Sequence, residues 1–287
     1  MRLDKDTKIL IIGLGVIGGS YAAALTNAGY RVAAITKEKG DIEYALSHGM
    51  IAKGTTELDS VMIAEAELII FALYPTTFIK WIEENQGLFS PGVLITDVTG
   101  VKGEVVVPVQ SMLRGDVEFI SAHPMAGREQ KGVEFADPAV FRGANYIITP
   151  TEKNTPEAIE VCKKLGEVLG FAKISLLSVD EHDKMIAFLS QLTHVIAVTL
   201  MTSNDTPGLE RYTGDSFRDL TRIAKINDAM WAELFLTNKA ALLREMDRFS
   251  REFDRFREML RADDREGMRL AMRESTARRT LFDKPKA

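Results

Sequence analysis

Ile9-Leu-Ile-Ile-Gly13-Leu-Gly15-Val-Ile-Gly18 is the stretch that decides the fold. Four apolar residues bounded by glycine favour a strand buried on both faces of a parallel sheet, and a helix is expected to follow from Val16. Gly13 permits a tight turn, Gly15 lets the backbone approach a pyrophosphate, and Gly18 lets helix and strand pack closely. The helix N-terminus then faces the anion. The residues expected to contact a dinucleotide here are Gly13, Leu14, Gly15, Val16, Ile17 and Gly18.

Strands and helices alternate along the first 177 residues, which predicts an α/β fold with a mostly parallel sheet and helices on both faces. Strands are expected at 9–12, 31–35, 67–71, 93–96, 117–121, 146–149 and 172–175, and helices at 16–28, 41–48, 75–85 and 155–169. From Asp180 onward only helical periodicity remains. The sequence therefore predicts a Rossmann-type dinucleotide-binding domain over 1–177 and an all-helical domain over 178–287.

One long helix of the second domain carries an apolar stripe at spacings of 3, 4, 3 and 4 residues. Its members are Met246, Phe249, Phe253, Phe256 and Leu260. The stripe is too apolar to face water. Packing against other helices of the same subunit and packing against a second subunit are given equal weight.

Length, net charge and cysteine content exclude several kinds of protein and site. A length of 287 residues suggests about two domains, and a net charge of -5 argues against a surface built for nucleic-acid phosphates. The single cysteine, Cys162, permits no intrachain disulfide and no multi-cysteine metal site. The N-terminus has no signal-type apolar region, and no apolar run approaches the length of a bilayer span. We expect a cytoplasmic protein with no bound metal, no membrane and no nucleic-acid partner.

The choice between NAD and NADP turns on the end of the second predicted strand, where an acid accepts from the ribose 2′-hydroxyl in NAD binders. Thr36 occupies this position, and Lys37 and Lys39 follow. A threonine hydroxyl and a lysine suit a 2′-phosphate, so NADP is slightly favoured. If the lysines are only solvated loop charges, which is equally plausible, the cofactor stays NAD(P)+.

His123 has the best case among the four histidines for a role in chemistry. It follows the predicted strand 117–121, so it is expected to project from a carboxyl end into the crevice where ligands of such sheets bind. An imidazole can take a proton from a substrate hydroxyl as hydride leaves. The alternative is a structural loop histidine.

Several motifs together resemble the prephenate and arogenate dehydrogenase family of tyrosine biosynthesis, over nearly the whole chain. They are the loop Gly13 to Ser20, Thr96-Asp97 with Val101-Lys102, His123-Pro-Met-Ala-Gly-Arg-Glu129, Ser190 with His194, and Phe217-Arg-Asp219-Leu-Thr-Arg222. The resemblance implies oxidative decarboxylation of prephenate to 4-hydroxyphenylpyruvate with hydride transfer to NAD(P)+, and a homodimer formed through the helical domain. It makes Asp97 a candidate cofactor contact.

The resemblance also implies roles in the substrate site. His123 would hydrogen-bond the 4-hydroxyl, Arg222 would hold a carboxylate with its planar fork, and His194 would bind the side-chain carboxylate. Ser190 lies four residues before His194, so both are expected on one helix face. Asp219 and Glu129 are further candidate substrate contacts. Without the resemblance, His194 would be read as a core residue, Asp219 and Arg222 as a surface pair, and Glu129 as a loop charge.

Gly100 departs from the family pattern, which commonly has serine directly before Val-Lys. Either Thr99, one residue earlier, supplies the missing hydroxyl as a catalytic group, or a water does. Arogenate is the alternative substrate, but Lys131 beside Glu129 adds no acid for its amine, which favours prephenate. A non-catalytic dinucleotide sensor is the remaining alternative. A 3-hydroxyacid dehydrogenase or an imine reductase would not explain the His-Pro-Met-Ala-Gly run.

Overall fold

The computed structural model describes residues 2–127 and 130–283. The strands are β1 Ile9–Ile12, β2 Val32–Ile35, β3 Lys53–Thr55, β4 Leu68–Phe71, β5 Leu94–Asp97, β6 Glu118–Phe119, β7 Ser121–Pro124, β8 Asn145–Thr149 and β9 Lys173–Leu176. The helices of the first 177 residues are α1 Val16–Asn27, α2 Lys39–Ser47, α3 Ser60–Glu65, α4 Pro75–Asn85, α5 Gly103–Met112 and α6 Pro156–Leu169. Later helices are α7 Val179–Ile186, α8 Thr193–Thr202, α9 Asp215–Thr221, α10 Asp228–Thr237, α11 Lys239–Arg261 and α12 Arg265–Thr280.

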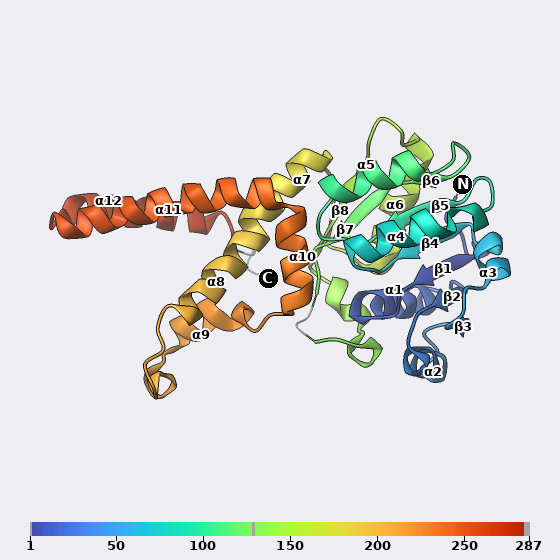
Figure 1. Ribbon diagram of the computed structural model, residues 1–287, viewed down its shortest axis with the longest axis horizontal. Helices are drawn as coiled ribbons and strands as arrows, with labels where there is room; N and C mark the ends of the chain where they lie inside the picture. Colours follow the sequence, from blue (N-terminus) through green and yellow to red (C-terminus); the bar gives the residue numbers. More distant parts are fainter. Residues whose placement is uncertain (1, 128–129, 284–287) are drawn as a thin grey trace. The chain divides into compact units, whose positions relative to one another are not determined.

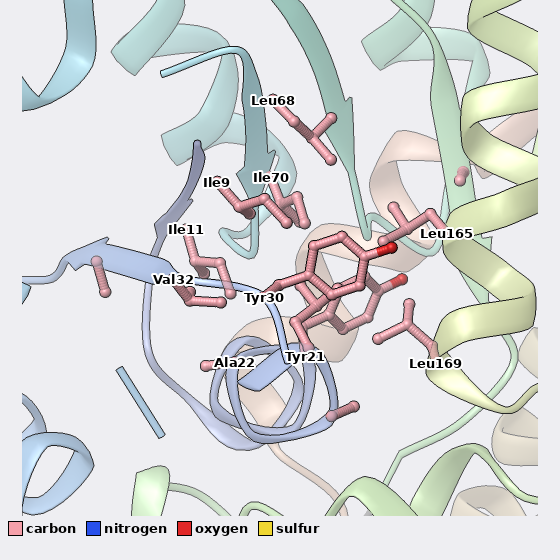
Figure 2. Packing of buried hydrophobic residues seen from close by; sticks show 14 of the residues in the cluster. Ile9, Ile11, Tyr21, Ala22, Tyr30, Val32, Leu68, Ile70, Leu165 and Leu169 are labelled. Carbon is pink, nitrogen blue, oxygen red and sulfur yellow. The ribbon is translucent and has the colours of Figure 1, made fainter. Parts of the chain in front are cut away.

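The main sheet has six strands in the order β3-β2-β1-β4-β5-β6, all parallel (Figure 1). This order confirms the predicted Rossmann-type domain. Alternate side chains of each strand enter two cores, as pleating requires. Ile9 and Ile11 pack under α1, α2 and α6, whereas Leu10 and Ile12 pack under α3, α4 and α5. Figure 2 shows the first of these cores, with Tyr21 of α1 among the strand residues.

β7 contains His123 and belongs to a second sheet of three strands, β7-β8-β9. The prediction of one strand over 117–121 with His123 in the loop beyond it is therefore wrong. The chain leaves the main sheet after Ile120, and β7 then pairs antiparallel with β8, which places His123 opposite Ile147. The apolar run continues through this change of sheet, so hydrophobicity alone could not reveal it.

Most other predicted elements of this domain are confirmed within two residues, and α4 matches its predicted bounds. β3 was missed because Lys53-Gly-Thr55 has no apolar run. Its Gly54 leaves room for Ile42 of α2, since a Cβ there would lie 2.8 Å from the Ile42 side chain.

α7, the π-helical turn Ala187–Leu192 and α8 follow one another without a break and span residues 179–202 (Figure 1). This run corrects the expectation that no segment reaches the length of a bilayer span, because by length and composition alone it is long and apolar enough. Core helices of globular proteins can be equally long and apolar. Here His182 and Asp183 are buried and hydrogen-bonded within the run.

Two compact units are distinguished by their internal contacts, Met1–Lys239 and Ala240–Ala287. The first contains both sheets and helices α1 to α10. The second contains most of α11 and all of α12, where Asp264 caps α12 by accepting from the Gly267 N–H at 2.9 Å. The apolar stripe of α11 is largely exposed in the single chain, with Phe253 and Leu260 more than half accessible. Within the unit Ala240–Ala287, packing between α11 and α12 therefore does not cover it.

Candidate functional site

The glycine loop has the geometry that its spacing predicts. Gly13 has a φ of +99°, and a Cβ there would lie 2.6 Å from the Ala72 carbonyl oxygen. A Cβ on Gly18 would lie 2.0 Å from the Gly13 oxygen, so strand and helix can approach only without it. Gly15 differs, because no heavy atom lies within 4 Å of its Cβ position. It is the N-cap of α1 and supplies no side-chain cap. This open helix N-terminus fits a dinucleotide pyrophosphate.

The other predicted cofactor residues differ in how far their side chains are exposed. Val16 and Ile17 are half-buried, whereas the Leu14 side chain lies in the core. The Thr36 hydroxyl oxygen accepts from the Leu14 N–H at 3.3 Å, which ties the end of β2 to the glycine loop. Lys37 is exposed, and Lys39 forms an ion pair with Glu43 at 3.3 Å.

Asp97, at the end of β5, is fully buried and does not lie on a surface that a cofactor would touch. One carboxylate oxygen accepts from the Ser121 hydroxyl and the Ala122 N–H, and the other accepts from the Thr99 N–H at 3.0 Å. The buried Lys102 ammonium donates to Asp97 at 3.0 Å and to the Ala122 carbonyl at 2.8 Å. Burial lowers the pKa of Lys102, and Asp97 opposes that shift. This network fixes the loop after β5 against β7.

Thr99 belongs to the same network, and among the described residues its hydroxyl bonds join it to Asp97, Val101 and Lys102 and none joins it to His123. Its oxygen contacts the Asp97 carboxylate, and lies 3.0 Å from the Val101 carbonyl and 3.2 Å from the Lys102 ammonium. The position facing His123 is Gly100. A Cβ on Gly100 would lie 3.6 Å from His123 Nε2, an ordinary contact distance.

His123 is half-buried and forms one end of a chain of three side chains. Its Nδ1 lies 2.8 Å from His182 Nε2, and His182 Nδ1 lies 2.8 Å from Asp183 Oδ1. Asp183 also accepts from the N–H groups of Lys102 and Gly103 at 2.9 and 2.7 Å, at the start of α5. His182 and Asp183 were not predicted from the sequence, because a His-Asp pair near the start of a helix is typical of a solvated surface.

The pKa of His123 is held well below 6.5, first by burial, then by His182 and Lys102. Burial also lowers the pKa of His182, although its hydrogen bond to Asp183 opposes the shift. Both imidazoles are therefore neutral at pH 7. A neutral imidazole can accept a proton, which is the role predicted for His123.

His194 contacts Ser190 through the Ser190 backbone carbonyl, which lies in the π-helical turn. His194 Nδ1 donates to the Ser190 carbonyl at 2.8 Å, so the relation differs from the two side chains on one α-helical face that the spacing predicted. π-Helical turns are frequent at functional sites. The His194 ring stacks on Trp231 of α10, with centroids 3.7 Å apart. Trp231 was not predicted from the sequence, because it lies outside the motifs that resemble the family.

α10 links the two histidine regions. Its Leu234 side chain lies 3.8 Å from the Cβ position of Gly100, and its Leu234 carbonyl accepts from Gln191 at 2.8 Å. Asn238, directly after the helix, donates to Gln191 and to the Asp183 carbonyl, both at 2.9 Å. The helix that carries Trp231 is thus fixed to the helix that carries His182.

Arg222 and Asp219 are both exposed on the segment that follows α8. Asp219 lies in α9, and Arg222 begins the short 3-10 helix Arg222–Ala224, which packs against α8. α8 also carries His194, so Arg222 and His194 belong to neighbouring elements. Glu129 lies outside the described residues.

Two family models match consecutive parts of the chain. Residues 21–175 match the nucleotide-binding domain of prephenate dehydrogenase, and residues 178–274 match its dimerization domain. Together they include His123, His182, His194 and Arg222, whereas the glycine loop at residues 13–18 lies before the first match.

Named relatives and solved structures agree with these matches. The prephenate dehydrogenase of Bacillus subtilis is 33% identical over 277 residues, which cover 93% of this chain and 74% of that protein. The structure of Aquifex aeolicus prephenate dehydrogenase with hydroxyphenyl propionate and NAD+ has a TM-score of 0.89 at 27% identity, covering 99% and 100% of the two chains. Synechocystis arogenate dehydrogenase shares the fold, with a TM-score of 0.84 at 24% identity and coverage of 96% and 100%. The chain belongs to the prephenate dehydrogenase family.

Proposed function

We propose that this site converts prephenate to 4-hydroxyphenylpyruvate and carbon dioxide, with hydride passing from C4 to NAD(P)+. The observation that carries the proposal is the neutral His123, whose Nε2 faces the space beside Gly100. Gly100 follows β5 and the glycine loop follows β1, so both lie at the carboxyl edge of one parallel sheet. Ligands of such sheets bind at this edge.

In this reaction the protein's own residues position the substrate and transfer a proton. The bound nicotinamide supplies the hydride acceptor. His123 Nε2 takes the proton of the 4-hydroxyl as C4 becomes a carbonyl carbon, and loss of the ring carboxylate as carbon dioxide sends its electron pair into the ring. The phenolate oxygen then recovers the proton from His123, so no net proton is released. Formation of the aromatic ring favours the decarboxylation.

Substrate carboxylates are assigned to the residues on α8 and the segment after it. Arg222 suits a carboxylate because its guanidinium presents two parallel donors. His194 is held in orientation by the Ser190 carbonyl and by stacking on Trp231, which directs its Nε2 away from the helix backbone. Replacing Arg222 or His194 is expected to raise KM for prephenate more than it lowers kcat, because binding and not proton transfer is lost.

Prephenate is proposed over arogenate because Lys131, two residues after Glu129, adds a base and no further acid for the arogenate amine. Initial rates with each substrate and each oxidised cofactor, followed by absorbance of the reduced cofactor, test the proposal. Faster turnover of prephenate supports it. Faster turnover of arogenate would assign the alternative substrate, and no reduced cofactor with either would leave the non-catalytic sensor.

For the cofactor, we propose NAD+ over NADP+, which reverses the lean drawn from Thr36 and Lys37. Lys39 is already paired with Glu43, and the pKa of Asp41 is raised by burial and by the nearby carboxylates of Glu134 and Glu38. Negative charge around the start of α2 disfavours a 2′-phosphate. The same rate assay tests this assignment, and a higher kcat/KM with NADP+ would contradict it.

The matched dimerization domain supports a homodimer. We propose that the exposed stripe of α11 forms part of its interface, because burial in an interface would remove these apolar side chains from water. Sedimentation equilibrium of the full chain distinguishes a dimer from a monomer.

A further inference from the structure

We propose that His182 and Asp183 are positioning residues that fix the tautomer of His123 and share the proton that it takes from the substrate. The proposal deepens the function proposed above and rests on it. Its basis is the continuous chain from His123 Nδ1 through His182 to Asp183, with both nitrogen contacts at 2.8 Å.

Asp183 determines which nitrogen of each imidazole carries the proton. Its two oxygens accept from the backbone N–H groups of Lys102 and Gly103, so both oxygens already act as hydrogen-bond acceptors. The contact at Asp183 Oδ1 therefore requires a proton on His182 Nδ1. Since His182 is neutral, its Nε2 carries only a lone pair.

The tautomer of His123 follows from that of His182. A lone pair on His182 Nε2 requires the proton of the shared 2.8 Å bond to lie on His123 Nδ1. A neutral His123 then has its lone pair on Nε2, the nitrogen that faces the space beside Gly100. The chain thus presents the basic nitrogen to the substrate. The opposite tautomer would place an N–H there, which cannot accept a proton.

The chain also accommodates the charge that forms during turnover. When His123 Nε2 binds the substrate proton, the Nδ1 proton can move along the short bond to His182 Nε2. One N–H bond then breaks as another forms, and the positive charge moves next to the Asp183 carboxylate. Reversal of both transfers returns the proton to the product oxygen. Lys102 and Asp97 are the other charged groups that influence the pair, and Lys102 disfavours its protonation.

Two variants at His182 separate positioning from packing. The amide oxygen of His182→Gln can accept from His123 Nδ1, whereas His182→Leu fills the space without an acceptor. We expect His182→Leu to lower kcat about 10- to 100-fold, the effect of losing a hydrogen bond to a charged group, with KM for prephenate little changed. His182→Gln should recover most of the rate.

Nitrogen NMR of protein carrying ¹⁵N-labelled histidine provides a readout that needs no turnover. The ring signals of His123 are assigned by their loss in His123→Asn. Wild type and His182→Gln should show the Nδ1–H tautomer at pH 7, and His182→Leu should shift toward Nε2–H. An Nε2–H tautomer in the wild type would overturn the proposal even if prephenate is turned over. So would unchanged kcat in His182→Leu, or a rate in His182→Gln as low as in His182→Leu when both melt like the wild type. Failure of the proposed function would instead appear as no reduced cofactor in the wild type.

Discussion

Gly15→Ala and Gly18→Ala are expected to have opposite effects, although each adds a single methyl group to the same loop. The Cβ of Gly18→Ala would lie 2.0 Å from the Gly13 carbonyl oxygen, which is backbone and cannot rotate away. The Cβ of Gly15→Ala would meet no heavy atom within 4 Å, and the backbone at Gly15, with a φ of -80°, is open to alanine. One variant therefore strains the fold, and the other alters only the cofactor site.

The magnitudes follow from these contacts. Forcing a methyl group into packed backbone costs about 1 to 3 kcal/mol, so Gly18→Ala should unfold at lower urea concentration. Gly15→Ala should gain about 0.4 to 1 kcal/mol, because alanine restricts the unfolded chain. Its methyl group keeps the pyrophosphate from the N-terminus of α1. Losing one charge-assisted hydrogen bond costs about 1.5 to 3 kcal/mol, which weakens cofactor binding about 10- to 100-fold.

Urea unfolding without cofactor and calorimetric titration of NAD+ measure the two effects separately. Gly15→Ala should match or exceed the wild type in stability and bind NAD+ weakly. If Gly15→Ala bound NAD+ as tightly as the wild type, the pyrophosphate would not lie at Gly15. If it lost stability like Gly18→Ala, the open space at Gly15 would be wrong.

Three further variants test other parts of the structure. Lys102→Met should lose about 3 to 5 kcal/mol in urea unfolding, because Asp97 stays buried without its cation, and adding Asp97→Leu should restore part of the loss; equal stability of the single and double variants would refute the coupling. Gly100→Ser should fold normally, with its Cβ 3.6 Å from His123 Nε2, and increase kcat/KM for prephenate about two- to tenfold through one added hydrogen bond; a lower melting temperature would show that the space is not open. Phe253→Glu should convert a dimer to a monomer in sedimentation equilibrium, and an unchanged dimer would place the interface elsewhere.

The sequence predicted the main sheet well because its determinants are local. Continuous apolar runs such as Ile9–Ile12 specify buried parallel strands, and Gly13 and Gly18 specify how the first helix packs. The change from β6 to β7 could not be predicted, because it depends on hydrogen bonds from Ser121 and Ala122 to Asp97, more than 20 residues earlier. The exposure of the α11 stripe also depends on tertiary structure.

The site was predicted in part. His123 stood out because proline and glycine follow it in an unusual motif, and the residues of the family pattern led to His194 and Arg222. His182 and Trp231 were missed, since their partners are 59 and 37 positions away and no local pattern connects them. Thr99 was assigned a hydroxyl role from its place in sequence, but its side chain points into the network of Asp97 and Lys102.

The pH dependence of kcat/KM for prephenate, in the wild type and in His123→Asn, tests the central claim most directly. His123 accepts a proton only when neutral, so activity is retained above its pKa and lost as the pH falls through it. Burial, His182 and Lys102 hold that pKa well below 6.5, so the acid limb of the wild type should lie below pH 6.5. His123→Asn should lower kcat/KM about 10²- to 10⁴-fold and remove this limb. Near-normal turnover in His123→Asn, or the same acid limb without the imidazole, would contradict the assignment of His123 as the base.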